Sequence, residues 1–537
     1  MSKDSDRVQH GNYIGNRRGF LKSALSSVPL WAIGASIATA LESCATDSKS
    51  KNNELAADEV LEWTATEAIN HIHSGSITAE HYASQLLKRY RASRALNVIT
   101  WIDENRVIER ARSVDAARSK GQTLGLLAGL PIVVKDNINT VGFPTTAGTP
   151  TLKGFYPHAD APVAEILFRN GAILLGKTNM HELAKGGTSS NPAFGFAKNP
   201  YDMNRVPGGS SGGTGAAISA RITPAGLGTD TGGSARIPAA FCGIVGFRPS
   251  TGGPRKTWTD DGVVPIAHSV DTPGPMGRTV SDVALLNATV TGATAPTALP
   301  LRGVRMGVPR GFYWEDLDSE VARVSERALE KLRDAGAILT DVDLLQWAQA
   351  ADETFGTLVR MHSVQDLADF LTTNVPNVSV DQVVAGTLSK DVAAMLRDLI
   401  AHPILPQRAE EAVKVLRPKL TRQYEELFRG SDISAIVYPT VPVLAPKIRS
   451  QGDAPEDTIE VNGKQLSEFR TIVRNTHLSG VAGTPSLTIP AGLSAFGVPV
   501  GISFEGLVGD DSRLLGLGLS LEATLGRLPA PVLRTTA

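Results

Sequence analysis

The stretch 207–236 contains two segments rich in glycine and hydroxyl side chains: Gly208-Gly209-Ser210-Ser211-Gly212-Gly213 and Gly228-Thr229-Asp230-Thr231-Gly232-Gly233-Ser234-Ala235-Arg236. Glycine lets backbone N–H groups approach a ligand closely. The same composition is typical of a flexible linker. However, the intervening residues 214–227 are small and apolar, as a packed helix and a buried strand would be. The stretch therefore predicts a functional site held by a folded core.

The first segment also matches a known serine hydrolase motif. Gly208-Gly209-Ser210-Ser211-Gly212 fits the G-x-S-x-G elbow of the α/β-hydrolases, which needs a strand before the serine and an acid and a histidine after it. The residues at 201–204 are polar, and the downstream histidines lie in no recognisable context for a base; they are His268, His362, His402 and His477. The elbow, with Ser210 as nucleophile, remains the alternative mechanism.

Lys135 follows the apolar run Leu130-Pro131-Ile132-Val133-Val134, which predicts a buried strand with the lysine at its end. A lone lysine is ordinarily a solvated surface residue. Here the run before it is wholly apolar, and Thr145-Thr146-Ala147-Gly148 after it is small and polar. Burial would lower the pKa of Lys135 toward that of a neutral amine able to act as a base.

A phosphate-binding loop is a false match in this chain. Gly171-Ala172-Ile173-Leu174-Leu175-Gly176-Lys177-Thr178 fits its pattern. A true phosphate loop follows a strand, whereas here the residues inside the motif are themselves the expected strand. We therefore expect no ATP or GTP.

Strands and helices alternate along the rest of the chain. Helices are expected at 79–90 with Thr78 as cap, at 104–120, at 162–170 and at 319–335, and strands at 304–308, 433–438, 486–489 and 500–504. The segment 271–276 is expected to be a rigid turn before a helix that starts near Ser281. The helical segment 345–429 either lines a substrate pocket or only covers the sheet. The pattern predicts an α/β fold, a single large mixed-sheet domain covered by helices over 58–534.

Net charge and cysteine content give no support for a nucleic-acid partner, a structural disulfide or a zinc site. The 537 residues have a formal net charge of −1, which gives no support for nucleic acid as a partner. The two cysteines, Cys44 and Cys242, predict no structural disulfide, and no His/Cys cluster has the sequence spacing of a zinc site.

The N-terminus resembles a bacterial twin-arginine export signal. Arg17-Arg18 and Phe20 precede a weakly apolar stretch at 25–41, and Ala38-Thr39-Ala40 fits a cleavage site. We predict an export signal at 1–40 that engages the twin-arginine export machinery, a polar linker at 41–57 and a periplasmic protein. A lipid anchor at Cys44 is an alternative.

The two hydroxyl segments and Lys135 together suit acyl transfer. Thr231, Gly232, Gly233 and Ser234 offer consecutive backbone N–H groups beside a serine, which suits an oxyanion hole. Lys135 and Ser210 together can deprotonate Ser234 without a histidine.

The chain is identified as a member of the amidase signature family over about 61–526. The motifs that carry the resemblance are 207–213, 228–238, Lys135-Asp136-Asn137, Asp271-Thr272-Pro273-Gly274-Pro275-Met276 and Gly497-Val498-Pro499-Val500-Gly501. The resemblance implies Ser234 as nucleophile, Ser210 as a bridging serine held by a cis peptide, and Lys135 as base. It also implies an oxyanion hole made by the amides of Thr231, Gly232, Gly233 and Ser234, without metal or cofactor.

Two further motifs look most like the indoleacetamide and mandelamide hydrolase branch: Lys177-Thr178-Asn179-Met180-His181-Glu182-Leu183-Ala184 and Gly246-Phe247-Arg248-Pro249-Ser250-Thr251-Gly252. That likeness implies a small arylalkyl primary amide as substrate. Aryl acylamides, carbamates and peptide amides are the alternatives, because that branch is largely cytoplasmic and this chain carries a leader. An amidotransferase subunit and an inactive amide-binding protein are the competing functions. A homodimer is left open.

Overall fold

The computed structural model describes residues 57–251 and 257–533. The predicted export signal, Cys44 and the predicted linker up to residue 56 lie outside the described residues. Contacts divide the chain into Met1–Glu54 and Leu55–Ala537, and every element described below belongs to the second unit.

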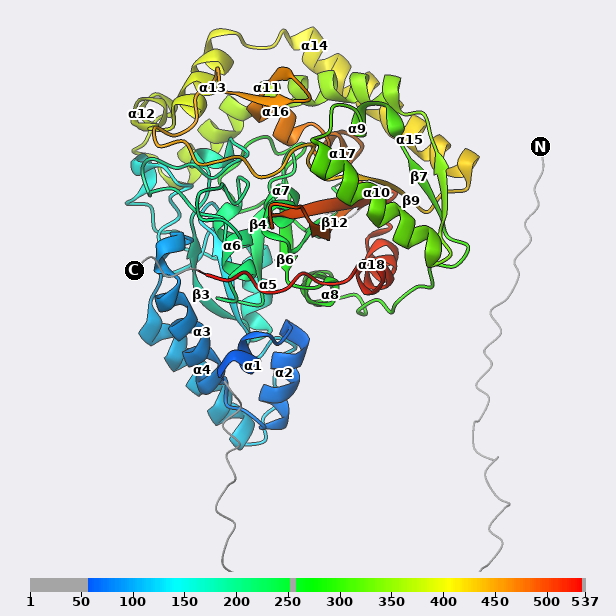
Figure 1. Cartoon of the computed structure of the whole chain (residues 1–537). Helices are drawn as coiled ribbons and strands as arrows, with labels where there is room; N and C mark the ends of the chain where they lie inside the picture. Colours follow the sequence, from blue (N-terminus) through cyan, green and yellow to red (C-terminus); the bar gives the residue numbers. More distant parts are fainter. Residues whose placement is uncertain (1–56, 252–256, 534–537) are drawn as a thin grey trace, which may run out of the picture. The chain divides into compact units, whose positions relative to one another are not determined.

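A mixed sheet of eleven strands runs through this unit (Figure 1). Its order is β1-β3-β2-β4-β6-β5-β12-β13-β9-β7-β8. The strands are β1 (Ile99–Trp101), β2 (Pro131–Lys135), β3 (Ile173–Thr178), β4 (Ala225–Thr229), β5 (Val245–Arg248), β6 (Pro273–Gly277), β7 (Arg305–Val308), β8 (Ile338–Asp341), β9 (Ala435–Pro439), β12 (Ser486–Leu493) and β13 (Pro499–Glu505). The expected mixed-sheet α/β fold is confirmed.

Parallel pairing is confined to two groups within the sheet, β3-β2-β4 and β9-β7-β8, and antiparallel strands connect them. The strands β2 and β4 are buried along their whole length. Parallel strands covered on both faces need continuous apolar runs, which is why both were visible in the sequence.

Helices cover the sheet on both sides. One apolar core packs β2, β3 and β4 against α2 (Ala65–Ser74), α3 (Ala79–Ala92), α4 (Glu104–Ser119) and α5 (Pro162–Arg169). A second core packs β7, β12 and β13 against α8 (Val280–Thr291), α10 (Ser319–Asp334) and α18 (Asp511–Leu525). Between these two cores, α6 (Gly212–Ser219) and α7 (Arg236–Cys242) pack against each other and are wholly buried.

Local signals placed most of these helices correctly. The Thr78 hydroxyl caps α3 by accepting the His81 amide at 3.0 Å, as its position in the sequence predicted. The helices expected at 104–120, 162–170 and 319–335 are α4, α5 and α10 within a residue or two.

The expected turn at 271–276 is wrong, because Pro273–Gly277 forms the central strand β6. The Arg278 N–H donates to the Pro224 carbonyl oxygen, on the side of β6 that faces β4. Backbone N–H groups of successive residues in a strand point to opposite sides, so the nitrogens of Pro273 and Pro275 point the other way, toward β5. There β5 pairs only with Met276 and Gly277. The prolines therefore cost no ladder hydrogen bond, and proline is tolerated inside the sheet.

The segment 345–429 is mostly helical, as expected. It comprises α11 (Leu345–Asn374), α12 (Val380–Gly386), α13 (Lys390–Ala401), α14 (Pro406–Glu411), a π-helical turn (Ala412–Leu416) and α15 (Arg417–Ser431). In Figure 1, α11 and α13 lie near α16 (Glu468–Val473), at the opposite end of this unit from α1 (Ala57–Leu61) to α4. Within the described residues, none of the helices combines the length and apolarity that crossing a membrane requires.

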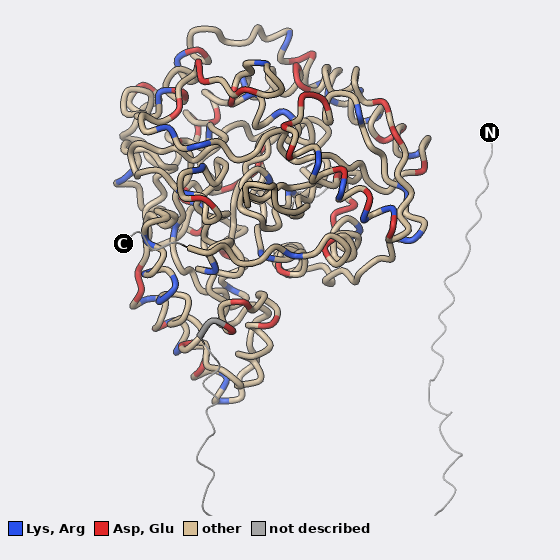
Figure 2. Tube along the Cα trace, viewed as in Figure 1, with Lys and Arg blue, Asp and Glu red and all other residues tan. Residues whose placement is uncertain are grey.

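Basic and acidic residues are interspersed along the backbone trace (Figure 2). Beside α16, β10 (Thr458–Val461) and β11 (Lys464–Ser467) form a separate hairpin with exposed charged residues.

Candidate active site

The parallel pair β2 and β4 brings two candidate side chains to one edge of the sheet. Val133 and Val134 pair with Gly226 and Leu227, and the two strands end at Lys135 and Thr229. The carboxyl ends of neighbouring parallel strands share an edge, where ligands bind in open α/β sheets. Lys135 Nζ lies 2.7 Å from Thr229 Oγ1 as a result.

Ser210 is the second hydroxyl partner of Lys135. Its Oγ lies 2.7 Å from Lys135 Nζ, and both side chains are fully buried. The peptide bond between Gly209 and Ser210 is cis. The structure thus joins two residues that are 75 positions apart in the chain.

Burial lowers the pKa of Lys135 to about 7, and the charges of Asp230 and Asp271 only partly oppose this. An amine with such a pKa is about half neutral at pH 7, and its neutral fraction rises above that pH. Lys135 is therefore suited to accept a proton, as its apolar sequence context predicted.

Ser234 lies on the neighbouring loop. The Ser211 amide donates to the Ser234 carbonyl oxygen at 3.1 Å, so this backbone contact holds the two serine-bearing segments side by side. Ser234 lines a cavity together with Gly209, Thr231 and Gly232. Gly233 between them has φ 115°, and a side chain there would collide with Thr476. Only glycine fits this position without strain.

Asp230 anchors the loop through two buried arginines. Its carboxylate accepts two hydrogen bonds of 2.9 Å from Arg236 and one of 3.1 Å from Arg248. All three side chains are fully buried. Burial alone would raise the pKa of Asp230, but the two guanidinium groups hold it well below its ordinary range.

The amides predicted to form an oxyanion hole differ in their surroundings. The Gly233 N–H donates to Asp230 Oδ1 at 3.0 Å, so it is directed toward the anchoring carboxylate. The Thr231 hydroxyl donates to Asp271 Oδ1 at 2.6 Å, which fixes the start of the loop. Thr231, Gly232 and Ser234 line the cavity.

The cavity has a volume of about 800 Å³. The apolar and aromatic part of its lining comes from several elements and includes Ile266, Phe312, Phe355, Val359, Leu399 and Phe469. Phe355 and Val359 belong to α11, so the helical segment 345–429 lines the pocket as well as covering the sheet.

The alternative mechanisms find little support in this geometry. The stretch before Ser210 is not one of the described strands. His477 lines the cavity, but its Nε2 lies 2.7 Å from Asp352 and its Nδ1 lies 2.9 Å from the Val473 carbonyl, so both ring nitrogens are engaged. Gly176, Lys177 and Thr178 of the false phosphate loop lie inside β3, and Lys177 is buried 3.6 Å from Asp136.

Sequence reasoning assigned no role to Thr229, Asp230 and Asp271, although the motifs quoted for the chain include all three. Asp230 lies between Thr229 and Thr231, six residues before Arg236, so the nearby opposite charge is the one signal that the sequence offered. Phe355 and Val359 left no signal, because their place in the pocket depends on how α11 packs.

A family model for amidases matches residues 82–515. The chain belongs to the amidase signature family. It is a hydrolase that acts on amide bonds, as the resemblance implied.

Named relatives of this family align over most of their length. The mandelamide hydrolase of Pseudomonas putida is 37% identical over 494 residues, which cover 88% of this chain and 94% of the relative. The indoleacetamide hydrolase of Agrobacterium vitis is 36% identical and covers 82% of this chain and 92% of its own length. The solved peptide amidase of Stenotrophomonas maltophilia superposes with a TM-score of 0.73 at 27% identity, covering 88% of this chain and 99% of that one.

Proposed function

We propose that this amidase cleaves the C–N bond of a small carboxylic amide through an acyl-enzyme on Ser234, with Ser210 and Lys135 as the proton relay. The observation that carries the proposal is the fully buried contact of 2.7 Å between Lys135 Nζ and Ser210 Oγ beside the Ser234 loop. A lysine with a pKa near 7 can serve as a base at physiological pH.

Each proton in this relay is returned. Neutral Lys135 accepts the Ser210 proton while Ser210 accepts that of Ser234, and Ser234 Oγ bonds to the amide carbon. The relay then protonates the leaving nitrogen, the C–N bond breaks, and the amine or ammonia departs. Water is deprotonated by the same relay, attacks the acyl carbon and releases the acid and Ser234.

The developing oxyanion is stabilised by backbone amides of the cavity-lining loop, those of Thr231, Gly232 and Ser234. The Gly233 amide was expected to join them. Because it already donates to Asp230, we propose that Gly233 mainly shapes the loop.

The substrate proposed is a small arylalkyl primary amide. The names of the mandelamide and indoleacetamide hydrolases support this class, as does the aromatic wall formed by Phe312, Phe355 and Phe469. A cavity of about 800 Å³ also has room for a longer chain, so a peptide amide is the second candidate, in keeping with the peptide amidase relative.

Ammonia release across a panel of arylalkyl, alkyl and peptide amides tests both points. We expect arylalkyl amides to give the highest kcat/KM and Ser234→Ala to abolish turnover of every amide. Full activity of Ser234→Ala would contradict the mechanism, and a preference for peptide amides would favour the second candidate. An amidotransferase subunit would instead release ammonia chiefly from glutamine when its partner subunits are present.

We also propose that the protein is exported to the periplasm by the twin-arginine route. The support is the Arg17-Arg18 pair before a weakly apolar stretch. Replacing both arginines by lysine is expected to retain the protein in the cytoplasm in cell fractionation, whereas Lys22→Arg is not. Cys44→Ser with lipid labelling tests the alternative of a lipid anchor.

A further inference from the structure

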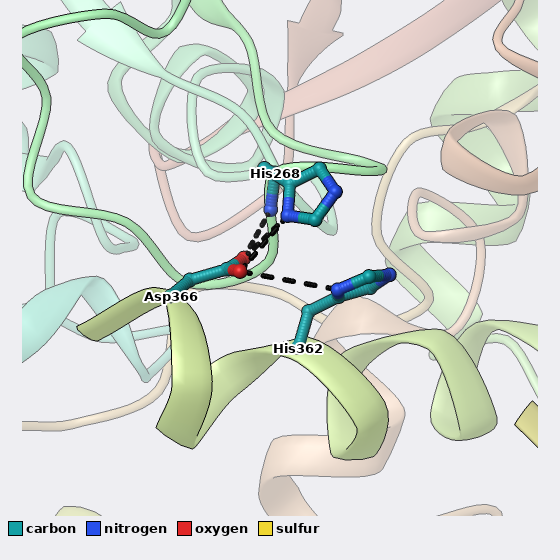
Figure 3. A group of neighbouring side chains, drawn as sticks. All are labelled: His268, His362 and Asp366. Carbon is teal, nitrogen blue, oxygen red and sulfur yellow. Dashed lines mark hydrogen bonds and ion pairs between the residues drawn. The ribbon is translucent and has the colours of Figure 1, made fainter. Parts of the chain in front are cut away.

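Two histidines and an aspartate meet beside the substrate pocket, outside the machinery described above (Figure 3). His268 lies in the loop that precedes β6. His362 and Asp366 lie one turn apart on α11, so their side chains share a face of that helix. The sequence does not reveal the cluster, because His268 is far from His362 and Asp366 along the chain and only the fold brings them together.

The ligand atoms of these side chains converge. Asp366 Oδ1 lies 2.9 Å from His268 Nδ1 and 3.9 Å from His362 Nδ1, and no two of the three ligand atoms are more than 4.8 Å apart. Zinc bonds to nitrogen and oxygen of about 2.0–2.1 Å in tetrahedral geometry put neighbouring ligand atoms roughly 3.3 Å apart. The two distances to Asp366 differ from this spacing by about half an ångström, and no pair of ligand atoms differs by more than about 1.5 Å. The His268 side chain, 59% exposed, is free to make these adjustments.

The carboxylate is already oriented for such a role. The backbone N–H of His268 donates to Asp366 Oδ2 at 2.7 Å. This bond holds one oxygen and leaves Oδ1 toward the two Nδ1 atoms, which both face Asp366 in Figure 3. Second-shell hydrogen bonds of this kind orient the ligands of metal sites.

We propose that His268 Nδ1, His362 Nδ1 and Asp366 Oδ1 bind one divalent transition-metal ion of the zinc class, with water completing the coordination. Each histidine binds through an unprotonated Nδ1 and carries its ring proton on Nε2. In neutral His268 the proton that Nδ1 donates to Asp366 is lost to solvent and Nε2 takes one up, so there is no net proton release. The positive charges of Lys185 and Arg417 lie nearby and repel a bound metal cation. We therefore expect weaker binding than at closed sites with four protein ligands.

A second group of similar composition, His181, Asp391 and Asp453, is chemically unsuited. The Ser189 N–H donates to His181 Nδ1 at 3.2 Å, so that nitrogen carries the lone pair. Nε2 then carries the proton, and it lies 3.0 Å from Asp391 Oδ2 as a donor. A metal on Nε2 would require the proton to move to Nδ1, and the Ser189 N–H prevents this, whereas Nε2 of His268 has no such donor among the hydrogen bonds of the described residues. This group therefore provides an internal comparison.

The proposed ion would join two walls of the pocket. The His268 loop is held by Asp271, which accepts the amides of Ile266 and Ala267 and the hydroxyl of Thr231. The other two ligands lie on α11, which carries Phe355 and Val359 into the cavity. The ion therefore clamps the loop to the helix and serves structure, and it takes no part in the chemical step.

Equilibrium dialysis and calorimetry with Zn²⁺ on the full chain, purified without a polyhistidine tag, test the proposal. We expect one saturable ion, and binding weakened by roughly 10-fold or more in His268→Ala and in His362→Ala. His268→Ala is the safer variant, because its exposed side chain supports little packing. His402→Ala is the matched control. His402 Nδ1 also pairs with an aspartate, Asp398, at 2.9 Å, but this pair belongs to neither of the groups of three possible metal ligands found among the described residues.

The visible spectrum of bound Co²⁺ and hydrogen exchange add independent readouts. Zn²⁺ is expected to slow amide exchange at 266–271 in the unaltered protein and in His402→Ala, but not in His362→Ala. Absence of saturable binding would overturn the proposal, as would an affinity in His268→Ala and His362→Ala equal to that of the unaltered protein. Loss of the ion in Asp453→Asn with full retention in His268→Ala would place it at the other group and would overturn the proposal equally.

Discussion

Lys135 sets the pH dependence at the scale of single residues. Only its neutral form can accept a proton, and its pKa is about 7. We expect kcat/KM to increase as the pH rises through about 7 and to level off above it. Lys135→Arg should lose activity because a guanidinium stays charged. Lys185→Gln is the control: Lys185 also lines the cavity, and its loss should leave the limb near pH 7 in place. A profile that is flat through neutrality would contradict the role of Lys135.

Asp230 is the residue on which the loop depends for stability. Asp230→Asn leaves Arg236 and Arg248 buried without a compensating charge, and we expect the free energy of unfolding to fall by about 3–5 kcal/mol. Denaturant unfolding measures it. Because the pKa of Asp230 is lowered in the folded state, its contribution is complete above the ordinary Asp range and is lost only in strong acid. Glu165→Gln breaks an exposed pair with Arg169 and should change stability little; similar losses in both variants would contradict this account.

At the scale of elements, Gly213 of α6 packs against Val98, just before β1, and Asn179, just after β3. A side chain there would lie 2.6 Å from the Val98 carbonyl and would collide with the backbone of Asn179. We expect Gly213→Ala to destabilise the protein and to displace Ser210, three residues before it, so that activity falls in the remaining folded protein. Gly430→Ala is the matched control, since no atom lies within 4 Å of its added carbon. It should be neutral or slightly stabilising. Wild-type activity of Gly213→Ala would show that α6 does not fix Ser210.

The helix α11 shapes the acyl pocket through Phe355. Its ring would lie 3.2 Å from a side chain added at Gly232, so it packs directly over the glycine loop. We expect Phe355→Ala to raise the KM for arylalkyl amides by roughly 10-fold or more, because a large aromatic contact is lost, while kcat changes less. Gln365→Ala, on the exposed side of the same helix, should leave KM unchanged. Equal KM values for Phe355→Ala and the unaltered enzyme would exclude α11 from substrate binding.

At the scale of the whole molecule, much of the fold could be read from local pattern. The apolar runs that became β2, β9, β12 and β13 and the cap at Thr78 are properties of short segments, so the sequence displays them directly. The segment that became β6 was misread because its prolines are typical of turns, and only the short pairing with β5 makes them tolerable. Strand order and pairing are not local properties.

The site shows the same division. Serines between glycines and a lysine after an apolar run marked Ser210, Ser234 and Lys135 as candidates. Their convergence depends on the parallel pairing of β2 with β4, which no single segment specifies. For the same reason the engagement of the Gly233 amide by Asp230 and the meeting of His268 with α11 were beyond the sequence.

The central claim is that Ser234 carries the acyl group and that Ser210 only transfers protons. Labelling the full chain with a fluorophosphonate, followed by mass spectrometry of the modified peptide, tests it most directly. The account predicts modification of Ser234, at a reduced rate but at the same residue in Ser210→Ala and Lys135→Ala. Modification of Ser210 in the unaltered enzyme would contradict it.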